Sequence, residues 1–173
     1  MATKQEPSSP LVNAYQQMMS RVHQAMAHTD KANAPHPPLQ HYLDEAIEKT
    51  VALGELSREQ AEQIGRYLQR DLQDAATHWV ETESELASWL RFDLQLIEQQ
   101  VWEMFASVAD KTRLELLQLE DRAQLANCYQ TGEITGPGAL QCTECGVPIY
   151  FHATAAIPAC PACGHTEFTR VLD

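Results

Sequence analysis

Two Cys-x-x-Cys-Gly motifs near the C-terminus constrain this chain more than any other feature. The first is Cys142-Thr-Glu-Cys145-Gly146 and the second is Cys160-Pro-Ala-Cys163-Gly164, with fourteen residues between the two cysteine pairs. A metal ion held by four thiolates requires two such tight turns, because each turn aims two sulfurs at one centre. A glycine after each pair suits a turn that needs a positive φ. The pattern therefore predicts a metal site with the ligands Cys142, Cys145, Cys160 and Cys163.

Zinc is the metal that this ligand set favours, with one structural ion per chain. Four thiolates fill the coordination sphere of a tetrahedral ion and leave no position for water, so we expect the ion to stabilise structure and not to catalyse. Iron is the alternative metal, because the two pairs also resemble the four-thiolate site of rubredoxin, an electron carrier, and ligand softness does not separate the two metals. A dithiol redox pair would explain one motif and leave the second without a role.

The segment that carries the cysteines is too short to fold on a hydrophobic core of its own. Residues 132–173 number 42, and a segment of this size needs a metal, disulfides or a partner. Glycine, proline and β-forming residues also become frequent here, and they predict short strands near 147–151 and 167–171. We therefore expect a small β zinc ribbon at 132–173.

The residues before the ribbon predict a helical region over 9–128. Residues 1–8 carry no periodic pattern and are expected to be disordered. The first helix starts with Ser9 as N-cap and Pro10 at the first helical position. A proline-rich linker at 28–38 is expected to follow it, since each proline removes a backbone donor and disfavours helix before it.

Further helices follow the linker. One is predicted over 39–53, and the capping-box sequence Ser57-Arg-Glu-Gln60 predicts that the next begins directly after it. The polar stretch 81–85 is either a bend or part of one long helix, and the sequence does not decide between them. Apolar residues keep helical spacing over 86–108, and Asp110 or Thr112 is a candidate N-cap for a last helix. Short connections predict an antiparallel hairpin or bundle, so the fold class is mainly α with a small C-terminal β zinc ribbon.

The charge of the chain disfavours nucleic acid as a partner. There are 24 acidic and 12 basic residues, a formal net charge of −12, whereas a phosphate backbone is bound through Lys and Arg. Tyr150, Phe151 and Phe168 could stack a base, but a small core beneath the strands is the favoured interpretation. Within the ribbon Arg170 is the one basic residue, against four acidic ones: Glu133, Glu144, Glu167 and Asp173.

Targeting features are absent from the sequence. No segment approaches the roughly 20 apolar residues that span a bilayer, and the first residues lack the apolar core of a signal peptide. We therefore expect a cytoplasmic protein without a membrane partner, in which paired cysteines act as metal ligands and not as disulfides. The remaining cysteine, Cys128, is expected to pack as a small apolar residue near a helix end.

No catalytic or cofactor-binding residues are predicted. The helical region has no Glu-x-x-His pair, and the chain has no G-x-x-x-x-G-K-[ST], G-x-G-x-x-G or G-x-S-x-G motif. The first hypothesis is a non-enzymatic interaction or adaptor protein with an unknown protein partner, which also forms a homo-oligomer through the Trp- and Leu-rich face of its helices. The alternatives are a nucleic-acid or transcription-associated ribbon and a rubredoxin-like electron carrier.

The order of motifs resembles that of a known family. The carrying stretches are Gly132-Glu-Ile-Thr-Gly-Pro-Gly-Ala-Leu-Gln-Cys-Thr-Glu-Cys145, Cys160-Pro-Ala-Cys-Gly-His165 and Phe168-Thr-Arg170, with Asp110-Lys-Thr112 before the last helix. Together they are similar to the bacterial YbeL-like family of zinc-ribbon-containing proteins, over most of the chain from near Leu11. The resemblance implies helices followed by a zinc ribbon, with the four cysteines as ligands. It implies no catalytic residue, because the family's function is itself uncharacterised.

Overall fold

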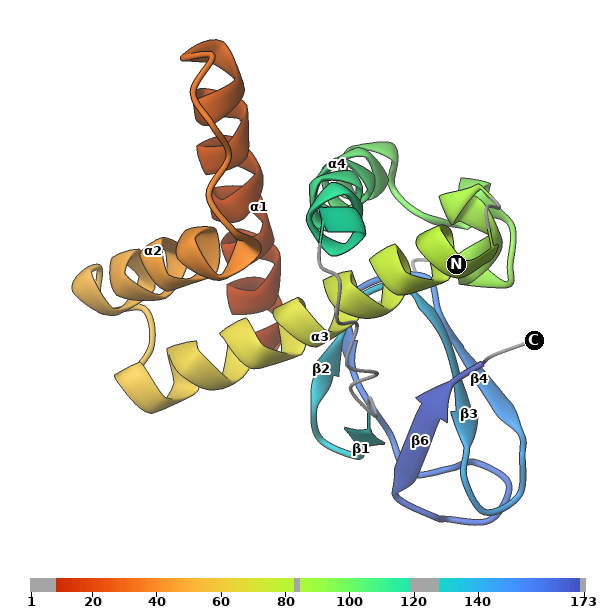
Figure 1. Ribbon diagram of the computed structural model, residues 1–173. Helices are drawn as coiled ribbons and strands as arrows, with labels where there is room; N and C mark the ends of the chain where they lie inside the picture. The colour runs from red at the N-terminus through yellow and green to blue at the C-terminus, as the bar shows by residue number, and fades with distance from the viewer. Residues whose placement is uncertain (1–8, 83–84, 119–127, 172–173) are drawn as a thin grey trace.

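The computed structural model describes residues 9–82, 85–118 and 128–171. Over these ranges the chain has four α-helices followed by a C-terminal β region of two small antiparallel sheets (Figure 1). The predicted fold class, mainly α with a small C-terminal β ribbon, is confirmed. The disorder expected for residues 1–8 concerns residues outside the described ranges.

Helix α1 (Pro10–Lys31) begins as predicted. The Ser9 side chain accepts a hydrogen bond from the Leu11 amide at 3.4 Å, and Pro10 occupies the first helical position. The helix continues through residues 28–31, so the prediction of an irregular linker is wrong for these residues. The first proline of the linker, Pro35, comes too late to break the helix here, and basic groups in the last turn suit the helix dipole.

Helices α2 (Leu39–Ala52) and α3 (Arg58–Thr82) form the predicted hairpin (Figure 1). Gly54 follows α2 with φ +69°, the conformation that a helix stop favours. The capping box at the start of α3 is complete: the Gln60 amide donates to Ser57 Oγ, and the Ser57 amide donates to Gln60 Oε1, each at 3.2 Å. Local sequence signals therefore set both ends of the turn.

The segment after α3 differs from the helix predicted over 86–108. Helix α3 ends at Thr82 and the backbone of Glu85 is extended, so one helix does not run through both of these residues. Residues 83–84, on which the choice between a bend and a continuous helix falls, lie outside the described ranges. Two short 3-10 helices follow, η1 (Leu86–Leu90) and η2 (Leu94–Leu96), so the helix predicted over 86–108 is wrong in its first part. Arg91 ends η1 in a left-handed conformation, φ +65°, and a backbone of this kind cannot continue a right-handed helix.

Helix α4 (Gln99–Gln118) contains the later part of the helix predicted over 86–108. It passes through the position where a new N-cap was predicted. Thr112 lies inside the helix and its hydroxyl donates to the Val108 carbonyl at 2.9 Å, so it satisfies its hydrogen bond without ending the helix.

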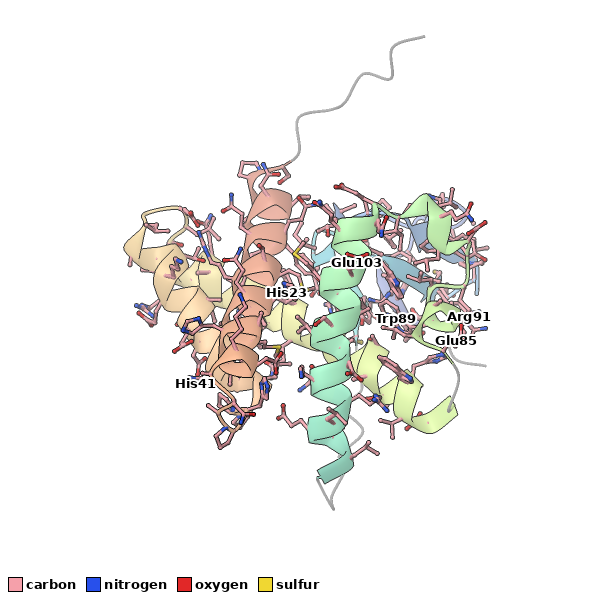
Figure 2. The ribbon with its side chains drawn as sticks, turned by 90° about the horizontal axis from the view of Figure 1, so that it is seen from above. His23, His41, Glu85, Trp89, Arg91 and Glu103 are labelled. Atoms are coloured by element: carbon pink, nitrogen blue, oxygen red, sulfur yellow. The ribbon has the colours of Figure 1, made fainter. Side chains whose placement is uncertain are left out.

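Helix α3 is the central element of the fold, with the other helices on one side and the β region on the other (Figure 1). Trp89 of η1 is 5 % exposed and stacks on Phe105 of α4, with ring centroids 5.3 Å apart. Figure 2 shows Trp89 on the side of the Glu85–Arg91 segment that faces α4. The helices share one hydrophobic core, to which α3 contributes Ile64, Leu68, Leu72 and Ala75.

The β region contains a sheet with the strand order β1-β6-β3-β4: β1 (Tyr129–Gln130), β6 (Glu167–Arg170), β3 (Gly138–Cys142) and β4 (Pro148–Phe151). Strands β2 (Ile134–Thr135) and β5 (Ala155–Ala156) pair separately and antiparallel. Strands at 147–151 and 167–171 were predicted, whereas β1 lies before the expected start of the ribbon at residue 132. The β region has its own small core, made of Tyr129, Leu140, Cys142, Phe151, Ile157, Cys160 and Phe168.

None of the helices in the described ranges combines the length and the apolar character that crossing a bilayer requires.

Candidate metal centre

The four predicted ligands Cys142, Cys145, Cys160 and Cys163 lie in one place. Their sulfur atoms are all within 4.8 Å of one another. The Cys142–Cys163 sulfurs are 3.6 Å apart and the Cys145–Cys160 sulfurs 3.5 Å, and no disulfide joins them. Four sulfurs bound tetrahedrally to zinc at about 2.3 Å would lie about 3.8 Å apart. The cluster therefore fits one tetrahedral ion of this size.

Each cysteine pair sits on the same kind of turn. The Gly146 amide donates to the Cys142 carbonyl at 3.0 Å, and the Gly164 amide donates to the Cys160 carbonyl at 2.8 Å. The two glycines have φ values of +73° and +77°, which a residue with a Cβ adopts only with strain. The positive φ expected from the sequence at both positions is confirmed.

The sheet holds the two turns together. Cys142 ends β3 and lies opposite Phe168 of β6, while the Thr143 amide donates to the Glu167 carbonyl at 3.1 Å. The second turn is closed by the Cys160 amide, which donates to the His165 carbonyl at 2.8 Å. One strand register therefore brings sulfurs from two distant segments to one centre.

Backbone amides act on the charge state of the thiols. Hydrogen bonds from the Cys163 and Ala162 amides lower the pKa of Cys160 to about 6. At Cys163 the amide of His165 also lowers the pKa, but burial and the neighbouring thiols outweigh it and raise the value to about 12. Since zinc binds thiolates, loading this site with zinc would release protons.

Comparison with known proteins identifies the family. The family model described as a zinc-ribbon containing domain matches residues 21–172. The chain belongs to this zinc-ribbon family. The Escherichia coli K12 protein named "Uncharacterized protein YbeL" is 28 % identical over 128 residues, which cover 74 % of this chain and 79 % of that protein. The proteins of the same name from E. coli O6:H1 and O157:H7 give the same values. No solved structure matches the chain.

Family membership confirms the resemblance expected from the sequence, and together with the sulfur cluster it supports metal binding by the ribbon. The fifth cysteine of this zinc-ribbon protein, Cys128, lies outside the cluster and is exposed. The prediction that Cys128 packs as a small apolar residue is therefore wrong.

A second group of polar residues, which the sequence did not predict, joins the ribbon to the helices. Its centre is Asp71 of α3, which is 0 % exposed. Asp71 Oδ2 accepts hydrogen bonds from the Tyr15 hydroxyl at 2.6 Å and from the Gly136 amide at 2.8 Å. Burial and the carboxylate raise the pKa of Tyr15, so its hydroxyl keeps the proton that it donates.

Arg170 of β6 supplies the positive charge of this group, and its side chain is 6 % exposed. Its Nη2 lies 3.3 Å from Asp71 Oδ1, and its Nε lies 3.5 Å from Asp74 Oδ2 and donates to the Tyr129 hydroxyl at 3.0 Å. The guanidinium also lies over the Trp89 ring, 4.5 Å from its centroid. We call Asp71, Asp74, Tyr129 and Arg170 the buried polar cluster.

The Gly136-Pro137-Gly138 stretch lets the backbone approach this cluster. A Cβ at position 136 would lie 2.9 Å from the Tyr15 hydroxyl, and one at position 138 would lie 2.6 Å from Arg170 Nη1. Neither approach leaves room for a side chain. The glycines and the position of Asp71, three residues after Leu68 on the apolar face of α3, are the signals from which the sequence could have pointed to a buried acid.

Asp74 makes stability depend on pH. Burial raises its pKa to about 6, although Arg170 lowers it in part. An unfolded Asp has a pKa of about 3.9, so the folded state holds this proton more tightly. The stabilising contribution is present below about pH 4 and is lost as the pH rises through about 6.

We therefore expect wild type to lose about 3 kcal/mol of unfolding free energy relative to Asp74→Asn between about pH 4 and pH 7. Urea unfolding at several pH values measures this difference. Asp44→Asn, at an exposed position of α2, is the control and should follow wild type. Parallel pH profiles for wild type and Asp74→Asn would contradict the assignment.

Proposed function

We propose that this chain is a non-enzymatic interaction protein of the cytoplasm, in which one zinc ion holds the ribbon in shape for a protein partner. Four free thiols gathered at one point suit a reducing compartment. Membership of the zinc-ribbon family favours zinc over iron. The ion, with a complete set of four protein ligands, would act on structure alone.

The surface charge of the ribbon is the observation that favours a protein partner over a nucleic acid. Arg170 is the one Lys or Arg among residues 128–171, and it is buried against Asp71 and Asp74. Glu144 and Glu167, in contrast, are exposed. Zinc bound by four thiolates would add a net charge of about −2. Such a surface repels a phosphate backbone, which supports a protein partner over a nucleic acid.

The aromatic residues of the ribbon lead to the same choice. Phe151 and Phe168 lie in the small core and are 6 % and 0 % exposed, so they do not form a platform for bases. Tyr150 is 49 % exposed and packs edge-on against Phe92, which also contacts the His152 ring. A tyrosine that packs against a neighbouring ring is a suitable anchor for a protein contact.

Two hollows among the described residues are in keeping with a non-enzymatic role. One, between α1, α4 and Pro137, has about 30 Å³ of space with an apolar lining, which is room for one or two waters. A second, of about 210 Å³, is an open groove between α2 and α3 whose lining contains no histidine, cysteine or serine. Neither groups a nucleophile with a base.

Self-association through the helices is part of the proposal. Self-association was suggested by the Trp- and Leu-rich face of the helices. Much of this face packs inside the chain, since Trp89, Leu86 and Leu90 are buried. Leu114 and Leu117 of α4 are 44 % and 49 % exposed and offer an apolar pair on one helix for a contact between copies. Size-exclusion chromatography with light scattering should give a dimer or larger assembly, and a clean monomer would refute this part.

Metal content and partner binding test the rest. Elemental analysis should find one zinc per chain in a colourless protein; a coloured, iron-loaded protein would favour the electron carrier.

The zinc-loaded chain is then used to isolate a protein partner from cell extract, and the affinity of the purified pair is measured. We expect Tyr150→Ala to weaken it at least about tenfold, and Leu53→Ala, at an exposed residue distant in sequence, to leave it unchanged. Salt-sensitive DNA or RNA binding without a protein complex would contradict the proposal.

A further inference from the structure

Strands β3 and β6 connect the metal centre to the buried polar cluster. Strand β3 begins at Gly138, beside the Arg170 guanidinium, and ends at the ligand Cys142. Strand β6 starts four residues after the ligand Cys163 and ends at Arg170. The strands are paired in register, with Leu140 opposite Arg170 and Cys142 opposite Phe168. At about 3.3 Å per residue, the four steps of β3 place the two sites about 13 Å apart.

The charge of Asp71 is balanced mainly by groups that the β region supplies. Its fully buried carboxylate receives the Gly136 amide and the Arg170 guanidinium, both of which follow β1 in the chain. Arg70 of α3 also lies 3.4 Å from Asp71 Oδ1, but it is shared with Glu133, next to β2. A buried carboxylate that loses its cation is strongly destabilised. The state of α3 at Asp71 therefore depends on where β6 holds Arg170.

From this geometry we infer that metal binding by the ribbon and the stability of helix α3 are coupled, with Asp71 and Arg170 as the coupling pair. A metal bound by the four cysteines fixes the two turns that begin β6 and end β3. These strands then hold Arg170 on Asp71. Asp71 is accordingly a positioning residue for a metal centre about four strand residues away, although it touches none of the ligands.

Two consequences follow because coupling between sites is reciprocal. Metal binding protects α3 against local opening, and any change that removes the charge of Asp71 weakens metal binding. The helical region thereby responds to the metal state of the ribbon. This inference goes beyond the proposed function, because it holds whether or not the chain binds a partner.

The first test measures zinc affinity by competition with a chromophoric chelator. Asp71→Asn is compared with wild type and with Glu62→Gln, an exposed acid on the same helix, at a temperature where all three keep their full helical circular dichroism. We expect Asp71→Asn to lower the affinity about tenfold, within the usual range for coupled sites, and Glu62→Gln to leave it unchanged. In the double variant with Arg170→Met the two losses should not add, since both act through one pair.

The second test uses wild type alone and does not depend on a variant folding. Hydrogen exchange of α3 amides around Asp71 is compared before and after zinc is removed, with amides in the middle of α2 as reference. We expect at least about tenfold loss of protection near Asp71, larger than any change in α2. Two results would overturn the inference. One is equal zinc affinity in Asp71→Asn and wild type, and the other is hydrogen exchange of the α3 amides at the same rate with and without zinc.

Discussion

Cys145→Ser is expected to abolish tight zinc binding and to unfold the ribbon while most helical structure persists. Cys145 is exposed, so serine at this position changes the ligand set without disturbing the small core. A four-cysteine zinc site contributes on the order of 10–16 kcal/mol of apparent binding free energy. The small core has too few residues to replace that contribution, because two of its seven members, Cys142 and Cys160, are themselves candidate ligands.

The measurements for this variant are metal content after desalting, limited proteolysis and far-ultraviolet circular dichroism. The protease should cleave the variant within residues 138–171 more readily than it cleaves wild type there. The helical circular dichroism signal should fall only modestly, because the helices have a separate core to which the β region contributes Ile134. Cys128→Ser is the matched control: it makes the same chemical change at an exposed cysteine outside the cluster. A Cys145→Ser protein that retains one tightly bound zinc and resists protease like the control would refute the assigned ligand set.

The features that sequence predicted correctly are those fixed by neighbouring residues. The spacing of each cysteine pair, with Gly146 or Gly164 behind it, specifies a turn within five residues. The Ser57–Gln60 capping box is similarly local, and both of its hydrogen bonds form. Such signals need no knowledge of the rest of the fold.

The segment 86–97 shows where periodicity failed. Leu86, Leu90 and Ile97 keep helical spacing and are all buried. However, Leu86 and Leu90 reach the core from η1 and Ile97 from extended backbone after η2, with Arg91 in a left-handed conformation between them. Apolar spacing reports which residues face the core and not which backbone presents them. Tertiary packing of Trp89 against Phe105 decides that, and no local signal contains it.

The pairing within the buried polar cluster lay beyond sequence reasoning for a different reason. The place of Asp71 on the apolar face of α3 points to a buried acid, but Asp71 and Arg170 are 99 positions apart, and no local signal joins them. The sequence-based charge count treated Arg170 as a surface residue of the ribbon. In the structure Arg170 is buried and forms ion pairs with two carboxylates of α3. A charge balance counted along the sequence therefore overstates the positive charge that the folded ribbon offers a partner.

Arg170→Met is expected to cost about 3–5 kcal/mol of unfolding free energy, because it leaves Asp71 and Asp74 buried without their shared cation. For a chain of this size the loss corresponds to a fall of roughly 10 °C in Tm. Arg58→Met is the matched control, since Arg58 pairs with Glu48 at the surface, where an ion pair contributes about 0–1 kcal/mol.

The loss caused by Arg170→Met should shrink in acid, where Asp74 in particular takes up a proton and no longer needs a cation. Urea unfolding of both variants at about pH 5 and pH 7.5 separates this charge effect from lost packing, which has no reason to change between these pH values. Equal losses for Arg170→Met and Arg58→Met at neutral pH would show that the buried charges of α3 do not depend on the ribbon, and the two parts of the chain would then be joined by apolar contacts alone.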